Sequence, residues 1–275
     1  MKLLQAAGVL SALLILVVIN SLLNSSGNES PFNPNPVAAA AQRTEEVPGM
    51  RMNMTMVFRT ESSPPTSIAA KGTYNGEDNL AEVSYNAAVE GRQMNFDAIL
   101  GEDGWYFRFP QYASRMPEGK EWLKLQGFPG QKDMSKPSVG GPGDALKMLR
   151  TTGSVERLGT EKIGGVKTTR YRATMTPAGL VEGFRRQGKD ELAEQMEQVQ
   201  ARIVGALHAE VFITPGGMLR RMRTEGTEVI DGKRVTTEVR FDFFDYGIKP
   251  NIQIPDDSQV YDLGPELEEK LGQLS

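Results

Sequence analysis

Cysteine is absent from the 275 residues of this chain. A chain without thiols forms no disulfides, no thiolate metal sites and no cysteine nucleophile, and it cannot be lipidated through cysteine. Histidine is nearly absent too, since His208 is the only one. A histidine metal cluster is therefore excluded, and any serine–histidine pair would have to use His208. This residue stands where a helical pattern gives way to a strand pattern, a place that favours a structural role.

Catalytic motifs are also missing. The chain contains neither a G-x-S-x-G elbow nor an H-E-x-x-H pair. The glycine-rich stretch VGGPGD at 139–144 lacks the Lys-Ser/Thr of a phosphate-binding loop, and Asp144 would repel a phosphate. The carboxylate pairs Asp242/Asp245 and Asp256/Asp257 are explained by a strand end and a turn. The sequence therefore predicts no enzyme activity, no cofactor and no metal site.

An excess of basic residues is lacking as well. The 31 Lys and Arg are outnumbered by 35 Asp and Glu, which gives a net charge of −4 and argues against a nucleic-acid partner. A hydrophobic fraction of 39% and a charged fraction of 24% are ordinary for a globular protein. Most of the chain is therefore expected to form a packed core.

Among the features that are present, the first is an apolar run, LLQAAGVLSALLILVVINSLL, at residues 3–23. A membrane-spanning helix needs about 20 such residues, whereas a cleaved signal has an apolar stretch of about 7–15. The small-residue pattern PVAAAAQ at 36–42 lies well beyond the run. Residues 1–23 are therefore predicted to anchor the chain in the cell membrane as a single pass, with Lys2 on the cytoplasmic side and the C-terminal domain outside the cytoplasm. Secretion after signal cleavage is the alternative.

The rest of the chain divides by composition. Residues 24–48 are rich in Asn, Ser, Pro and Ala without periodicity, which is typical of a disordered linker. Residues 49–263 are predicted to form one domain, and 264–275 a C-terminal tail.

Hydrophobicity in this domain alternates mostly with period two. The strand-like runs are joined by turn signals at Asn75-Gly76, Ile163–Gly165, Pro215–Gly217 and Asp231-Gly232. A helical pattern covers 177–207, where Gly188 is expected to break or kink it, and a shorter one covers 144–149. Tight turns pair neighbouring strands antiparallel. The predicted fold is α+β: a large curved antiparallel sheet of about ten strands around one long and one short helix.

Methionine is concentrated in the first strand, GMRMNMTMVFRT at 49–60. Met50, Met52, Met54 and Met56 occupy alternate positions and Phe58 continues the row, so they share one face. Three interpretations compete. Such a face can simply be core, thioethers can bind Cu(I), or flexible methionines can line an adaptable apolar cavity. The absence of interleaved His or Cys disfavours the metal.

Longer segments suggest a family. Two strand-rich segments are separated by a helical insertion. The first is VERLGTEKIGGVKTTRYRATM, and the second is EVFITPGGMLRRMRTEGTEVIDGKRVTTEVRFDFFDYGIKPNIQIPDDSQVYDL. The G-V-x-T-x-x-Y strand, the PGG hairpin and the closing D-Y-G-x-x-x-x-I-x-x-P-D-D resemble the LppX/LprAFG lipid-binding lipoproteins of actinobacteria, and more broadly LolA–LolB carriers. The resemblance covers 49–263. One departure is the missing N-terminal cysteine that carries the lipid in that family, so residues 3–23 would have to provide the anchor.

The resemblance implies a half-barrel sheet that encloses a cavity for acyl chains. The function expected is an extracytoplasmic, membrane-tethered protein that holds a lipid or another amphiphile, for lipid transfer or cell-envelope assembly. The alternative is a LolA-like sensor or scaffold that binds an envelope protein and has no ligand cavity. The residues expected to line the cavity are the apolar ones of the alternating strands: Met52, Met54, Met56, Phe58, Met94, Phe96, Trp105, Phe107, Met175, Met218, Met222, Val239 and Phe241.

Overall fold

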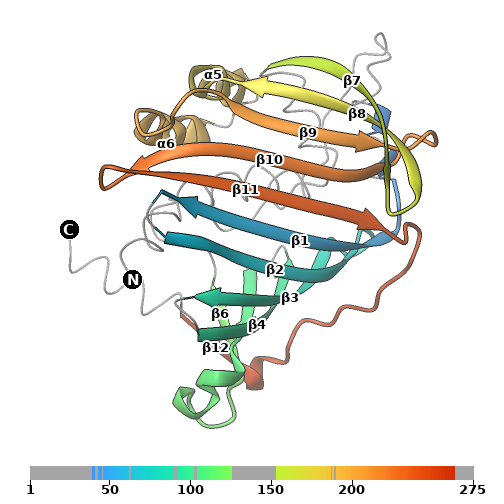
Figure 1. The fold of residues 1–275 in the computed structure, drawn as a ribbon. Helices are drawn as coiled ribbons and strands as arrows, with labels where there is room; N and C mark the ends of the chain where they lie inside the picture. The colour runs from blue at the N-terminus through green and yellow to red at the C-terminus, as the bar shows by residue number, and fades with distance from the viewer. Residues whose placement is uncertain are drawn as a thin grey trace.

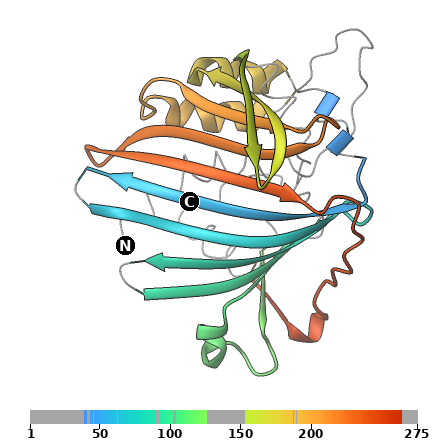
Figure 2. The ribbon, with the colours of Figure 1, turned by 45° about the vertical axis from the view of Figure 1, so that its right-hand side comes forward.

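One open sheet of twelve strands dominates the computed structural model, which describes residues 39–263 apart from 41–42, 45, 62, 90–91, 102–103, 126–152, 187 and 189. The sheet is strongly curved (Figures 1 and 2), and its strand order is β12-β6-β5-β4-β3-β2-β1-β11-β10-β9-β8-β7. The strands are β1 Gly49–Thr60, β2 Ser63–Asn75, β3 Leu80–Val89, β4 Arg92–Gly101, β5 Gly104–Arg108, β6 Trp122–Leu125, β7 Gly153–Ile163, β8 Val166–Met175, β9 Leu207–Ile213, β10 Leu219–Ile230, β11 Lys233–Phe244 and β12 Val260–Asp262.

The predicted curved antiparallel sheet is confirmed, with twelve strands in place of about ten. All four turn signals lie between paired strands: β2–β3, β7–β8, β9–β10 and β10–β11. The sequence did not predict β12. This strand has three residues and pairs with β6 in parallel, so only the return of the chain from a distance creates it.

The methionine row of β1 defines the two faces of the sheet. We call the face that carries Met52, Met54 and Met56 the inner face, and the opposite one the outer face. Met54 lies opposite Ala70 of β2 and Phe241 of β11, so a small side chain on one flank leaves room for the long thioether. Inner-face residues of β1–β4 and β8–β11 form one large core.

Two helices, α5 (Pro177–Arg186) and α6 (Asp190–Gln200), pack onto this core beside β8–β10 (Figure 1). Thr176 starts α5 because its hydroxyl accepts a hydrogen bond from the Gly179 N–H at 3.1 Å. Leu180, Phe184 and Met196 are among the side chains that the helices bury against the sheet.

The helical pattern predicted over 177–207 is confirmed at its break and wrong at its C-terminal end. It is broken at Gly188, as expected, where φ is +69°. It also ends at Gln200, because the backbone of 202–204 bonds to β10 instead. The Val204 N–H donates to the Thr227 carbonyl and the Val229 N–H to the Arg202 carbonyl, both at 2.8 Å. Leu207 therefore begins β9 and does not end a helix.

The segment 245–256 connects β11 to the short 3-10 helix η2 (Asp257–Gln259), which β12 follows (Figure 2). It passes so close to β1 that a side chain at Gly49 would meet the Ile248 carbonyl at 2.7 Å. The Asn75 amide donates to the Pro250 carbonyl at 3.0 Å. Ile252 and Val260 then complete a second core on the outer face, with Leu80, Ile99, Tyr106 and Trp122.

The N-terminal boundary of the packed region lies before Gly49. Ala40 and Thr44 are buried, and the Thr44 hydroxyl donates to the Ala40 carbonyl while accepting from the Leu219 N–H. The predicted linker 24–48 is therefore packed against β10 at its end. The predicted anchor 3–23, the helix at 144–149 and the tail 264–275 lie outside the described residues. In the described part of the chain, no helix is long and apolar enough to cross a membrane.

Candidate functional site

The residues predicted to line a cavity separate into two environments. Seven of them lie together in the inner-face core, with exposures of 0–7%. These are Met52, Met54, Met56, Met175, Met222, Val239 and Phe241. Their side chains touch the sheet and the core around them, so they form a packed floor on the inner face.

Five others are only half-buried: Phe58, Met94, Phe96, Trp105 and Phe107. Apart from Phe58, they come from β4 and β5, away from the helices. Met218 is not brought together with the rest. It lies in the turn before β10, where its carbonyl accepts from the Thr214 N–H at 2.9 Å, and it is absent from the inner-face core.

Half-buried aromatic rings form a continuous surface on the inner face of β3–β5. We call Tyr85, Phe96, Trp105, Phe107 and Phe109 the aromatic wall. Tyr85 and Phe96 stand opposite each other across β3 and β4, and their rings stack with centroids 4.5 Å apart. Phe96 contacts Phe109 at 5.2 Å and Phe107 at 6.4 Å, and Phe107 contacts Trp105 at 6.4 Å.

The predicted cavity lining includes three members of this wall and leaves out Tyr85 and Phe109. Both follow the period-two pattern, Tyr85 after Val83 and Phe109 after Trp105 and Phe107. Pairing β3 with β4 in register would have placed Tyr85 opposite Phe96. Burial raises the pKa of Tyr85 to about 12, so this side chain stays a neutral phenol and adds no charge to the wall.

An apolar ligand can use this wall because rings that are only half-buried still have a face to offer. Aromatic side chains bury large areas and contact other apolar groups by stacking or edge-to-face geometry. The methionines of the adjoining floor are unbranched and adapt to irregular neighbours. Together they make a surface for apolar contact.

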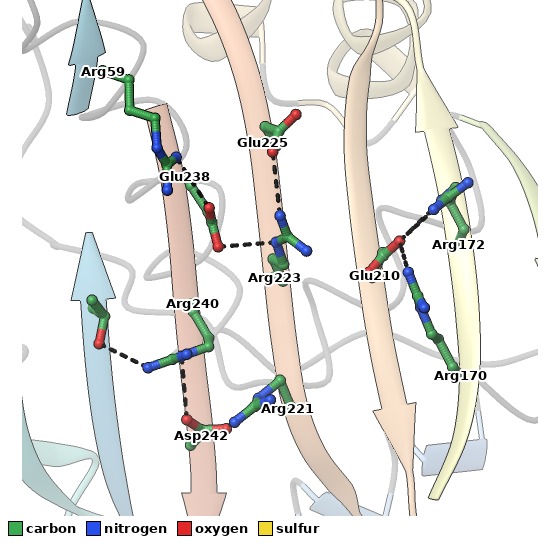
Figure 3. Close-up of polar contacts among 11 residues, drawn as sticks. Arg59, Arg170, Arg172, Glu210, Arg221, Arg223, Glu225, Glu238, Arg240 and Asp242 are labelled. Atoms are coloured by element: carbon green, nitrogen blue, oxygen red, sulfur yellow. Dashed lines mark hydrogen bonds and ion pairs between the residues drawn. The ribbon is translucent and has the colours of Figure 1, made fainter. Parts of the chain in front are cut away.

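The outer face of β8–β11 is different, because ion pairs line it (Figure 3). On β10 and β11, Arg223 pairs with Glu238 at 3.0 Å and with Glu225 at 3.4 Å, and Arg221 pairs with Asp242 at 2.5 Å. Glu225 and Glu238 stand directly opposite each other, an unfavourable arrangement for like charges. Arg223 relieves it by bridging both carboxylates.

Glu210 is the most buried carboxylate of this network. Its Oε1 accepts hydrogen bonds from Arg170 at 2.6 Å and from Arg172 at 2.7 Å. Burial acts to raise the pKa of Glu210, but these two arginines outweigh it and hold the pKa below its ordinary value. The pKa of Asp97 is lowered in the same way. Burial acts to raise this pKa, but hydrogen bonds from Ser84 and Arg108 outweigh the effect of burial.

In the described part of the chain, two pockets open on this polar face. One of about 280 Å³ is lined by Arg170, Arg172, His208, Glu210, Arg223 and Glu225. Another of about 490 Å³ lies mainly among polar side chains of β1–β4 and β11. His208 is exposed on β9, with Nδ1 3.4 Å from the Thr174 hydroxyl. Over the described ranges, no group of three or more acidic or histidine side chains could hold a metal ion.

Comparisons with known proteins give similarity at low identity. No family model matches the chain. An uncharacterized 31.2 kDa protein of Streptomyces griseus, from the rplA–rplJ intergenic region, is 23% identical over 255 residues, which cover 86% of this chain and 81% of that protein. Among solved structures, the lipoprotein LppX of Mycobacterium tuberculosis is 12% identical with a TM-score of 0.44, over 80% of this chain and 100% of that one. LprF of Mycobacterium bovis is 15% identical with a TM-score of 0.43, over 84% and 99%. Similarity at this level leaves the family open, so the function has to be inferred from the chain's own residues.

Proposed function

We propose that this protein is an extracytoplasmic, membrane-tethered binding protein that holds the apolar part of a lipid or another amphiphile against the aromatic wall. One observation carries the proposal: five aromatic side chains line one region of the inner face and remain half-buried, while the methionines of the floor are buried. A large ring left partly uncovered on the core side of a sheet retains apolar area that a ligand can bury.

The free energies of acyl-chain burial and of association suit a carrier. Burying one methylene gives about 0.8 kcal/mol, so a 16-carbon chain offers on the order of 12 kcal/mol before costs. Association itself costs about 4–15 kcal/mol. The remainder is a modest affinity, which suits a protein that must also release its ligand.

The cavity residues divide into two roles in this proposal. Phe58, Met94, Phe96, Trp105 and Phe107 contact the ligand, together with Tyr85 and Phe109. Met52, Met54, Met56, Met175 and Met222 form the floor beneath it, where flexible thioethers adjust to chains of different shape. Val239 and Phe241 support that floor. Met218 has no role in ligand contact.

The two tryptophans of the chain supply a test. Trp105 belongs to the aromatic wall, whereas Trp122 lies in the outer-face core with the Arg108 guanidinium 4.9 Å from its ring. A doxyl-labelled fatty acid bound at the wall should quench Trp105 and leave Trp122 bright. The Trp122→Phe variant should therefore keep strong quenching, and Trp105→Phe should lose it. Equal quenching of both variants would argue against binding at the wall.

A partner-binding domain without a ligand is the alternative. The burial of the methionine floor favours it, because those side chains already belong to one packed core. Half-exposed charged pairs on the outer face would supply the polar contacts. Organic extraction and mass spectrometry of the purified protein separate the two functions: co-purified lipid supports the carrier, and a ligand-free protein whose Trp105 is not quenched supports the partner-binding domain.

A further inference from the structure

The aromatic wall continues outward to solvent at one end. From Phe109 the ring contacts pass to Tyr112 at 6.2 Å, and the Arg115 guanidinium lies over the Tyr112 ring at 5.5 Å. The whole path therefore runs Tyr85, Phe96, Phe109, Tyr112 and Arg115. Its inner rings are half-buried, whereas Tyr112 is 42% exposed. An apolar path that ends in a cation has the polarity pattern of an amphiphile.

Tyr112 and Arg115 are held in place by the 3-10 helix η1 (Pro110–Arg115). Pro110 fixes its start, the Tyr112 N–H donates to the Phe109 carbonyl at 2.9 Å, and the Met116 N–H donates to the Ala113 carbonyl at 3.2 Å. No residue of η1 is buried. The helix follows β5 and lies at the far end of the molecule from α5 and α6 (Figure 1).

Arg115 lacks the carboxylate partner that many arginines of the described ranges have. Arg108 pairs with Asp97, Arg185 with Glu197 and Arg221 with Asp242. The Arg115 guanidinium instead lies over the ring of Tyr112, and no carboxylate in the described part of the chain pairs with it. A guanidinium stacked on a ring keeps its in-plane N–H groups available, and two of them match a carboxylate or phosphate.

We propose that the bound amphiphile is anionic, an inference that rests on the proposed function. Arg115 holds its carboxylate or phosphate head group, and its apolar chain runs inward from Tyr112 over the aromatic wall. The head group then stays at the solvent-exposed end, where no charge needs to be buried. The apolar part covers the half-buried rings. The site therefore selects a single-headed anion with a long apolar tail.

The test compares two probes that differ only in charge. The full chain is titrated with cis-parinaric acid and with its methyl ester, whose fluorescence rises in an apolar site. Variants are Arg115→Gln, Arg115→Lys and, as a matched control, Arg157→Gln. Arg157 is an exposed arginine of β7, at the opposite edge of the sheet, and its loss changes the net charge equally.

Arg115→Gln should weaken binding of the acid by about threefold to tenfold, the range of a partly exposed charge-assisted hydrogen bond, and leave the ester unchanged. Arg115→Lys should restore part of the preference for the acid, and Arg157→Gln should change neither probe. Unchanged acid binding in Arg115→Gln, or equal weakening of acid and ester, would overturn the proposal. So would displacement of the acid by equimolar inorganic phosphate, which would assign Arg115 to a free anion. If the wild-type chain binds neither probe, the lipid-binding function itself fails.

Discussion

At the scale of single residues, the thirteen methionines of the chain do not share one role. Met56 is 2% exposed and lies opposite Val239 of β11, inside the main core. Met94 lies opposite Ala87 on the same face and stays half-buried. Position on the inner face is therefore not enough to decide whether a methionine is core or available to a ligand.

Truncating these two side chains should have different effects. Met56→Ala leaves a cavity in a packed core and should lower the free energy of unfolding by about 2–5 kcal/mol. Met94→Ala should cost less than about 1 kcal/mol because a half-buried site leaves no closed cavity. Urea denaturation of both variants measures the difference. Equal losses would show that Met94 belongs to the packed floor.

Glu210 gives the stability a dependence on pH. Its pKa in the folded protein lies below the ordinary value of 4.5, since the hydrogen bonds from Arg170 and Arg172 outweigh burial. A carboxyl group of this kind stabilises the folded state above its unfolded pKa, and the contribution disappears as the pH falls through the folded value.

Glu210→Gln should therefore lower the free energy of unfolding by about 1–3 kcal/mol at pH 7. The gap to the wild type should close as the pH drops below 4.5. Denaturation curves from pH 7 to acid conditions check this. Glu225→Gln is the matched control, because Glu225 is 44% exposed and its contact with Arg223 spans 3.4 Å. A gap that persists in acid would contradict the assigned cause.

At the scale of elements, glycine decides where the helical hairpin turns. Gly188 separates α5 from α6 at φ +69°, and a side chain built there would meet nothing within 4 Å. Any cost of a substitution is therefore conformational and not steric. At Gly216, in the turn between β9 and β10, a side chain would meet only the Thr214 hydroxyl at an ordinary 3.8 Å, and the backbone φ is not positive.

Gly188→Ala should lower the free energy of unfolding by about 1–2 kcal/mol, because a left-handed conformation is unfavourable for a residue with a Cβ. Gly216→Ala should stay within about 0.5 kcal/mol. Thermal or urea denaturation of the pair distinguishes the two. Similar losses in both variants would mean that the turns matter for some reason other than φ.

The elements that the sequence predicted correctly are those with local signals. Alternation and turn residues predicted the hairpins, and Gly188 predicted the helix break. The helix end at Gln200 was missed because Ile203 and Leu207 continue the helical spacing, while their actual contacts are with the sheet. Of the aromatic wall, Phe96, Trp105 and Phe107 were assigned to the apolar face of their strands from alternation alone. Tyr85 needed the register of β3 on β4, and the contact of Phe109 with Phe96 needed the three-dimensional fold.

At the scale of the whole molecule, the sheet has a core on each face. The inner core joins β1–β4 and β8–β11 to the helices, and the outer core joins β3–β6 to the returning segment 245–262. The outer core is small, and it closes the end of the sheet that carries η1 and the aromatic wall. The return of the C-terminal segment therefore supports the end at which we propose that the head group binds.

Ile252 is the residue of that segment on which this support depends. It is 7% exposed in the outer core, whereas Ile254, two residues later, is 39% exposed. Ile252→Ala should destabilise the β5–β6–β12 end by about 2–3 kcal/mol, the lower part of the range for a buried isoleucine. Hydrogen exchange should then rise in 104–108 and 122–125 and stay unchanged in β8–β11, because opening is local. Ile254→Ala should alter neither region. Faster exchange throughout the sheet in Ile252→Ala would show instead that the two cores open as one cooperative unit, and that the end proposed to bind the head group does not open independently.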